Sequence, residues 1–256
     1  MALTRTTKLQ TKSSAEFGYN AFTTSAFTPS NNSLLVVAIS ALEGAGTSEM
    51  ASGVGGLNIS IDDVGADLTW TTRVTTLLTE GGWGYGTKIF TAPVTTGVSM
   101  TIVADVATAD IHDYFVEVYQ YTGYDTGSPV GGSIVGTDAD GDGAASITLS
   151  STPAADSDVL AFAILVLNTS GTPNVTEGAG WTELADQYSD AWAQAQSQAR
   201  TGSTSTTVAW ADLQASGGGA SGAALSAIEI KAAAGGGTNT GAGTLRGRFS
   251  MRTPIF

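Results

Sequence analysis

Two stretches of the chain share one design, in which a polar turn leads into an unbroken aliphatic run. The first is FTPSNNSLLVVAIS, residues 27–40, and the second is STPAADSDVLAFAI, residues 151–164. Proline fixes its own φ and biases the preceding residue towards extended geometry, so Thr-Pro followed by small polar residues predicts a turn. A short continuous apolar run bounded by turn residues is typical of a buried strand.

The residues around these two stretches also recur in the same order. The spacing between matching residues is 111 for Trp70 and Trp181, 109 for Trp83 and Trp192, 112 for Glu117 and Glu229, and 125 for Leu35 and Leu160. A surplus of about fourteen residues after the first apolar run explains most of this drift, because surface connections tolerate insertions. We therefore interpret the chain as a tandem duplication of one β unit.

Composition favours many short strands, since the chain has 33 Gly and only 13% charged residues. Residues 190–200 are rich in Ala and Gln, which favours a helix, but they alternate with a period of two, which favours a strand. The predicted fold class is all-β: an internally duplicated antiparallel β-sandwich of two jelly-roll-like units with an extended C-terminal arm. The alternative is a single larger sandwich in which the halves share sheets.

The predicted organisation has four parts. A basic N-terminal segment covers residues 1–12, and the first and second sandwich units cover residues 13–136 and 137–233. Residues 234–256 combine a Gly-rich linker with a basic and apolar segment, LRGRFSMRTPIF. Disordered solvating tails seldom carry so many apolar side chains, so we expect an arm that docks on a partner. The predicted docking residues are Leu245, Arg246, Arg248, Phe249, Met251, Arg252, Ile255 and Phe256.

The charge is divided along the chain. Residues 16–230 hold all 23 acidic residues, whereas seven of the ten basic residues lie in the two ends. An acidic body repels nucleic acid and anionic membranes, and basic ends can bind an acidic partner or another copy of the chain. Solvated terminal tails are the alternative reading. The sequence has no Cys, no apolar run of the ~18–20 residues that a membrane helix needs, and no signal-peptide core.

One acidic loop has the spacing that begins a calcium loop. Asp138, Asp140 and Asp142 stand in DADGDG, but position twelve is Leu149 where a bidentate Glu is expected. An acidic turn between the halves is therefore favoured over a calcium site, and no other cofactor is predicted. The single histidine, His112, has too few partners in the sequence for a metal site or a catalytic triad.

Two aromatic residues lie among glycines in GGWGYG. Trp83 and Tyr85 can form an exposed platform for a sugar or a neighbouring subunit. The competing interpretation places Trp83 and Trp192 at equivalent core positions of the two units, since matching large residues usually serve packing. We expect Trp70 and Trp181 to lie in the core as well.

Three segments, FTPSNNSLLVV, ADLTW and VEVYQYTG, carry a loose resemblance to β-sandwich accessory proteins of tailed-phage virions, the decoration or cement class and related tail and fibre proteins. The resemblance implies a non-enzymatic protein that binds other virion proteins and copies of itself, in a particle that assembles in the host cytoplasm without a signal peptide. A carbohydrate-binding fibre or adhesin module is the alternative. A glycan hydrolase ranks third, because no carboxylate pair stands out.

Overall fold

The computed structural model describes residues 2–19, 21–43, 59–80, 83–106, 111–138, 143–167, 173–188, 193–215 and 220–234. They form sixteen strands and no helix, so the predicted all-β class is confirmed. The stretch predicted as a strand over residues 190–200 is β14, Ala193–Thr201. Within this described part, nothing has the length and apolar character of a membrane-spanning helix.

The strands divide evenly between the two halves of the sequence. The first eight are β1 (Thr4–Tyr19), β2 (Ala21–Thr23), β3 (Ser33–Glu43), β4 (Ile59–Val64), β5 (Thr71–Glu80), β6 (Trp83–Val94), β7 (Thr101–Val106) and β8 (Ile111–Thr122). The last eight are β9 (Val130–Asp138), β10 (Ala145–Thr148), β11 (Asp158–Leu167), β12 (Pro173–Glu177), β13 (Thr182–Tyr188), β14 (Ala193–Thr201), β15 (Thr207–Ala215) and β16 (Ala220–Ile230).

Each half contains a five-stranded sheet and a three-stranded sheet. The first half has the orders β1-β8-β3-β6-β5 and β2-β7-β4, and the second half has β9-β16-β11-β14-β13 and β10-β15-β12. Each strand of the first half therefore has the same place in its sheet as the strand numbered eight higher has in the second half. A jelly roll pairs strands 1-8-3-6 in one sheet and 2-7-4-5 in the other, so each half is jelly-roll-like with its fifth strand moved to the larger sheet.

In the first half, the fifth strand lies in the larger sheet because it forms a hairpin with the sixth. Glu80 of β5 pairs with Trp83 of β6, so only two residues, both Gly, connect the strands. A two-residue Gly-Gly connection is typical of a hairpin, in which the two strands must lie side by side in one sheet.

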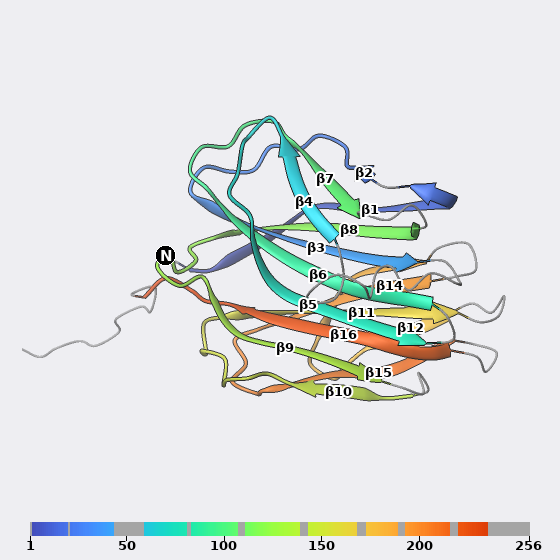
Figure 1. Cartoon of the computed structure of the whole chain (residues 1–256). Helices are drawn as coiled ribbons and strands as arrows, with labels where there is room; N and C mark the ends of the chain where they lie inside the picture. Colours follow the sequence, from blue (N-terminus) through green and yellow to red (C-terminus); the bar gives the residue numbers. More distant parts are fainter. Residues whose placement is uncertain are drawn as a thin grey trace, which may run out of the picture.

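The four sheets stack as layers in the order three, five, five, three, as Figure 1 shows from top to bottom. Each half has its own hydrophobic core between its two sheets. Two further clusters of buried residues lie between the two five-stranded sheets and contain residues of both halves. The halves thus share no sheet, but they are joined by a buried face.

This stacking explains the unbroken aliphatic runs with which the two repeated stretches end. In β3, Leu35 and Val37 point into the core of the first half, while Leu34 and Val36 point towards the second half. β11 behaves in the same way and buries alternate residues in its own core and in the join. A strand that is buried on both faces has no polar face, so its sequence does not alternate.

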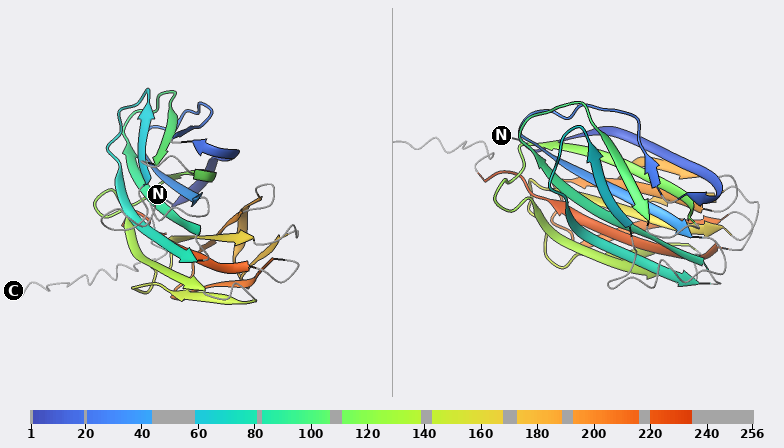
Figure 2. Two further views of the ribbon diagram at one scale, coloured as in Figure 1. Left: turned by 45° about the vertical axis from the view of Figure 1, so that its right-hand side comes forward. Right: turned by 45° about the horizontal axis from the view of Figure 1, so that its top comes forward.

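The two large sheets are closest along one side. There β5 crosses β9 and β16, and Thr76 Oγ1 donates a hydrogen bond of 3.3 Å to the carbonyl oxygen of Leu225. The facing strand β16 reads ASGAALSAIEI, and its small side chains allow this approach. Figure 2 shows the sheets spreading apart towards the opposite side, where β1 lies.

The strand limits differ from the predicted boundaries at two places. β1 begins at Thr4, so most of the predicted N-terminal segment pairs with β8 in the first sheet. β9 begins at Val130 and pairs with β16, so residues 130–136 lie in the second half rather than the first.

Candidate functional site

A group of buried polar side chains lies between the two five-stranded sheets. Glu117 of β8 is 3% exposed, and its Oε2 accepts hydrogen bonds from Ser197 Oγ at 2.5 Å and from the hydroxyl group of Tyr119. Tyr119 and Ser197 are themselves in hydrogen-bond contact at 2.9 Å. Because Ser197 belongs to β14, this cluster joins the two halves.

Two glutamines extend the cluster towards the surface. Gln10 of β1 lies directly opposite Glu117 in the strand register and donates from Nε2 to Tyr119 Oη at 3.3 Å and to the Leu184 carbonyl oxygen at 2.8 Å. Gln187 Nε2, on β13, is buried and makes no hydrogen bond of normal geometry. Gln10 is exposed, so the polar cluster extends from the buried Glu117 to the surface at β1.

Burial dominates the protonation of this cluster. It raises the pKa of Glu117 to about 7, although the hydrogen bonds from Ser197 and Tyr119 act in the opposite direction. Burial, and then the nearby carboxyl group of Glu117, also raise the pKa of Tyr119, so the phenol keeps its proton. A carboxyl group near neutrality therefore lies inside the join between the halves.

A second polar cluster lies at the end of the same join. Asp158 of β11 accepts hydrogen bonds from Tyr121 Oη and Thr201 Oγ1, each at 2.7 Å, and forms an ion pair with Arg5 of β1. Burial disfavours the charge on Arg5, but Asp158 and Tyr121 together outweigh this effect, so the pKa of Arg5 is raised. The ion pair ties the N-terminal strand to the second half.

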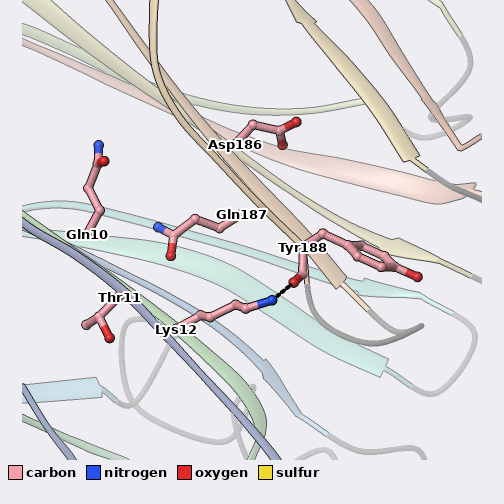
Figure 3. A pocket seen from close by; sticks show the side chains of 6 residues that line it. All are labelled: Gln10, Thr11, Lys12, Asp186, Gln187 and Tyr188. Carbon is pink, nitrogen blue, oxygen red and sulfur yellow. Dashed lines mark hydrogen bonds between the residues drawn. The ribbon is translucent and has the colours of Figure 1, made fainter.

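An open groove of about 550 Å³ lies where the sheets spread apart, between the edge strands β1 and β13 (Figure 3). Its lining residues are Gln10, Thr11, Lys12, Asp186, Gln187 and Tyr188. Lys12 Nζ reaches across the gap and donates to the carbonyl oxygen of Tyr188. Lys12 and Gln10 thus cap carbonyl groups on the free edge of β13, an arrangement that protects an edge strand from pairing with another chain.

The basic residues of the N-terminus therefore bind within the chain. Arg5, Gln10 and Lys12 all lie on β1 and all contact the second half. Lys8 contacts the carbonyl oxygen of Thr28 in the first half at 3.5 Å. Of these contacts, that of Arg5 is to an acidic side chain, Asp158, and the others are to backbone carbonyl oxygens.

Most residues of the predicted docking arm and of the possible calcium loop lie outside the described part of the structure. All eight residues of the predicted docking arm lie outside the described residues, and so do Asp140 and Asp142. Asp138 is the last residue of β9, where it pairs with Ala223. Among the described residues, no three His, Cys, Asp or Glu side chains come close enough to hold a metal ion.

The structure describes the side chain of one of the two residues in the predicted aromatic platform, Tyr85. Tyr85 is fully buried and packs in the join with Leu42 and Phe115, so its ring has no face open to a ligand. Trp83 begins β6, but its side chain lies outside the described part of the structure. Of the tryptophans expected in the core, Trp181 is buried in the second half and Trp70 is partly buried against the core of the first half.

Sequence reasoning missed the residues that join the halves. Glu117 and Asp158 each stand within or beside an apolar run, in YFVEVYQY and SDVLAF. A single acidic residue in a strand that is otherwise apolar is the available signal, because such a residue is rarely buried unless it is paired or hydrogen-bonded. The sequence does not show which partner it finds.

Comparison of the chain with protein-family models, with curated proteins and with solved structures gives no match. What the site does must therefore follow from its own geometry, which is that of a join. Its carboxyl, hydroxyl and amide groups connect β1 and β8 of the first half to β11, β13 and β14 of the second.

Proposed function

We propose that the protein is a non-enzymatic structural protein of a virion, a capsid decoration or related head or tail accessory protein that binds and stabilises an assembly. The observation that carries this proposal is that both ends of the described chain meet at one pole. A Cβ atom on Gly123 would lie 2.3 Å from the Ala2 carbonyl oxygen, and the amide of Ala233 donates to the Gly123 carbonyl oxygen at 2.9 Å. The segment after Ala233 therefore starts beside the N-terminus.

This geometry suits a body that attaches at one pole and presents its remaining surface to solvent. The N-terminal basic residues are occupied within the chain, by Asp158 and by backbone carbonyl groups. The basic and apolar sequence of residues 245–256 is then the stretch for which we propose an external partner, another virion protein or a second copy of the chain.

The character of the buried polar groups supports a role in assembly over catalysis. Glu117 and Ser197 have the chemistry of an acid and a nucleophile, but Ser197 is fully buried and Glu117 nearly so. A substrate could reach them only if the two large sheets separated. Their position serves to hold the halves together, and a rigid body is what a stabilising shell protein requires.

Deletion of residues 235–256 tests the proposal. We expect the truncated chain to keep the thermal stability of the body and to disappear from virions purified on a density gradient after assembly in its presence. Replacement of Arg246, Arg248 and Arg252 by Gln in the full chain should weaken incorporation in part, because it removes charge and keeps the apolar residues. Normal incorporation of the truncated chain would overturn the anchoring role.

A carbohydrate-binding module remains the second candidate, with Trp83 as its aromatic residue. The burial of Tyr85 removes the other half of the predicted platform and makes this function the weaker proposal. A glycan array with the wild type and Trp83→Ala separates the two. A specific signal that the substitution abolishes would favour sugar binding, and the absence of any signal would favour the structural role.

A further inference from the structure

Three oxygen atoms form a closed triangle between the two large sheets. They are Glu117 Oε2, Tyr119 Oη and Ser197 Oγ, and each lies within hydrogen-bond distance of the other two. Glu117 and Tyr119 come from β8, and Ser197 comes from β14. All three side chains are buried. The triangle therefore links the halves by contacts that water does not reach.

The charge on Glu117 decides how well the join holds around this triangle. Glu117 is 3% exposed, and its partners in the triangle are hydroxyl groups, which carry no positive charge. An ionised carboxylate at this position is buried without a counter-charge, and the hydrogen bonds offset that cost only in part. The protonated, neutral carboxyl group keeps its contacts with both hydroxyl groups without that cost.

We propose that Glu117 is a proton-dependent clamp between the two halves, closed when its carboxyl group is protonated and weakened when the group ionises. This property concerns the join within the body, so it stands whether or not the proposed virion function holds. Burial raises the pKa of Glu117 to about 7, which agrees with the cost of a carboxylate that has no counter-charge.

The groups that face Glu117 from the packed strands leave it as the group that titrates near neutral pH. On β8 itself the neighbour is Tyr119, whose raised pKa keeps it protonated, and on β3 the opposite residue is Ala38. Lys12 and Asp186, which line the groove with Gln10 and Gln187, are engaged with the Tyr188 carbonyl oxygen and with Gln194. The remaining facing side chains are Gln10 of β1, Gln187 and Tyr188 of β13, and Ser197 of β14.

The expected pH dependence has a definite sign. An unfolded chain releases the Glu117 proton near pH 4.5, whereas the folded protein holds it to about pH 7. Between these values the folded state binds one more proton than the unfolded state, so this group's contribution to stability is complete below pH 4.5, falls as the pH rises, and is lost above about pH 7. Ordinary buried carboxylates that are paired with a base show the opposite dependence.

The test is urea unfolding of the full chain between pH 4.5 and 8.5 for the wild type and Glu117→Gln, which keeps the shape and removes the titration. Subtracting the two curves removes the other ionisable groups. We expect the unfolding equilibrium constant of the wild type to rise about 100-fold relative to the variant from the acidic to the basic end. Asp156→Asn, at an exposed turn, serves as a control that should follow the wild type. Parallel wild-type and Glu117→Gln curves would overturn the proposal.

A second measurement keeps the proposal falsifiable if Glu117→Gln fails to fold. The carboxyl carbon of Glu117 can be titrated by NMR in the wild type and in Ser197→Ala. We expect a wild-type midpoint near pH 7 and a higher midpoint in Ser197→Ala, since the Ser197 hydrogen bond stabilises the ionised form. A wild-type midpoint below pH 5, or a downward shift in the variant, would sink the clamp.

Discussion

The two three-stranded sheets each bury a pair of one large and one small side chain, but the large side chain lies on different strands in the two halves. In the first half Phe22 of β2 lies opposite Ala104 of β7, and both contact the core. In the second half Ala145 of β10 lies opposite Trp210 of β15, again in the core. The large side chain has changed strand while the pair remains one large and one small residue. The shared topology therefore depends on total volume and pattern, and not on which strand supplies the bulk.

The turns that begin the repeated stretches show a similar exchange. Gln120 accepts from the amide of Ser30 at 2.7 Å in the first half, and Glu229 accepts from the amide of Ala154 at 2.8 Å in the second. Both acceptors occupy the same register, opposite Leu35 and Val159 respectively. A side-chain amide or a carboxylate can accept this one hydrogen bond. Glu229 also accepts from the amide of Gly132 through its second oxygen, and only a carboxylate has two acceptor oxygens.

The largest expected effect comes from breaking the core pair of the second half. Trp210→Ala removes a side chain that is 1% exposed and should lower the free energy of unfolding by about 3–5 kcal/mol. Adding Ala145→Phe to this variant recreates the arrangement of the first half and should recover part of the loss. Urea unfolding measures both. No recovery in the double variant would show that the two small sheets are not interchangeable.

The next effect concerns a position at which the halves differ in polarity. Asp158 holds the register that Leu34 holds in the first half. Asp158→Ala leaves the partly buried Arg5 without its partner and should cost about 3 kcal/mol in a urea titration. The double variant Arg5→Met, Asp158→Leu makes both halves apolar here and should come close to wild-type stability. A double variant as unstable as Asp158→Ala would contradict this account.

A smaller effect should separate the two turn acceptors. Glu229→Gln places an NH₂ group against a backbone amide and should cost about 1–3 kcal/mol, because one buried donor loses its acceptor. Gln120→Glu in the first half should cost less than about 1 kcal/mol, since the Ser30 hydroxyl group can donate to the new carboxylate. Equal losses in thermal unfolding would remove the distinction between the turns.

The smallest effect on stability is expected at the edge strands. Lys12 is exposed, so Lys12→Val should change the free energy of unfolding by less than about 0.5 kcal/mol. It uncaps the Tyr188 carbonyl oxygen on the edge of β13 and should increase self-association, which light scattering at rising concentration detects. Lys8→Val, on the same strand but without a contact to β13, is the matched control.

Much of the strand pattern could be read from the sequence, because turn chemistry and apolar runs are local signals. The apolar runs that end the two repeated stretches lie in β3 and β11, as buried strands. Asp190 to Arg200 was readable by its period of two in spite of its helical composition. The tandem duplication stays an inference, which the shared strand order of the two halves supports.

The residue-by-residue match between the strands of the two halves could not be read from the sequence. The sequence matches Leu35 with Leu160 and Glu117 with Glu229. The turn contacts of the Ser30 and Ala154 amides instead match Gln120 with Glu229, and the strand pairing then matches Leu35 with Val159. Both predicted matches are displaced by an odd number of residues and place the side chains on opposite faces of the sheet. The error arises in strands buried on both faces, where no polar alternation marks which residue points which way.

By itself, the sequence determined that the chain forms many antiparallel strands, where several turns lie and that the two apolar runs are buried strands. These properties follow from short-range chemistry, namely proline and glycine geometry and the period of the apolar residues. Only the tertiary structure decided that the two large sheets pack against each other and place Glu117 against Ser197. That contact joins residues eighty positions apart, and no local signal specifies a partner at such a distance.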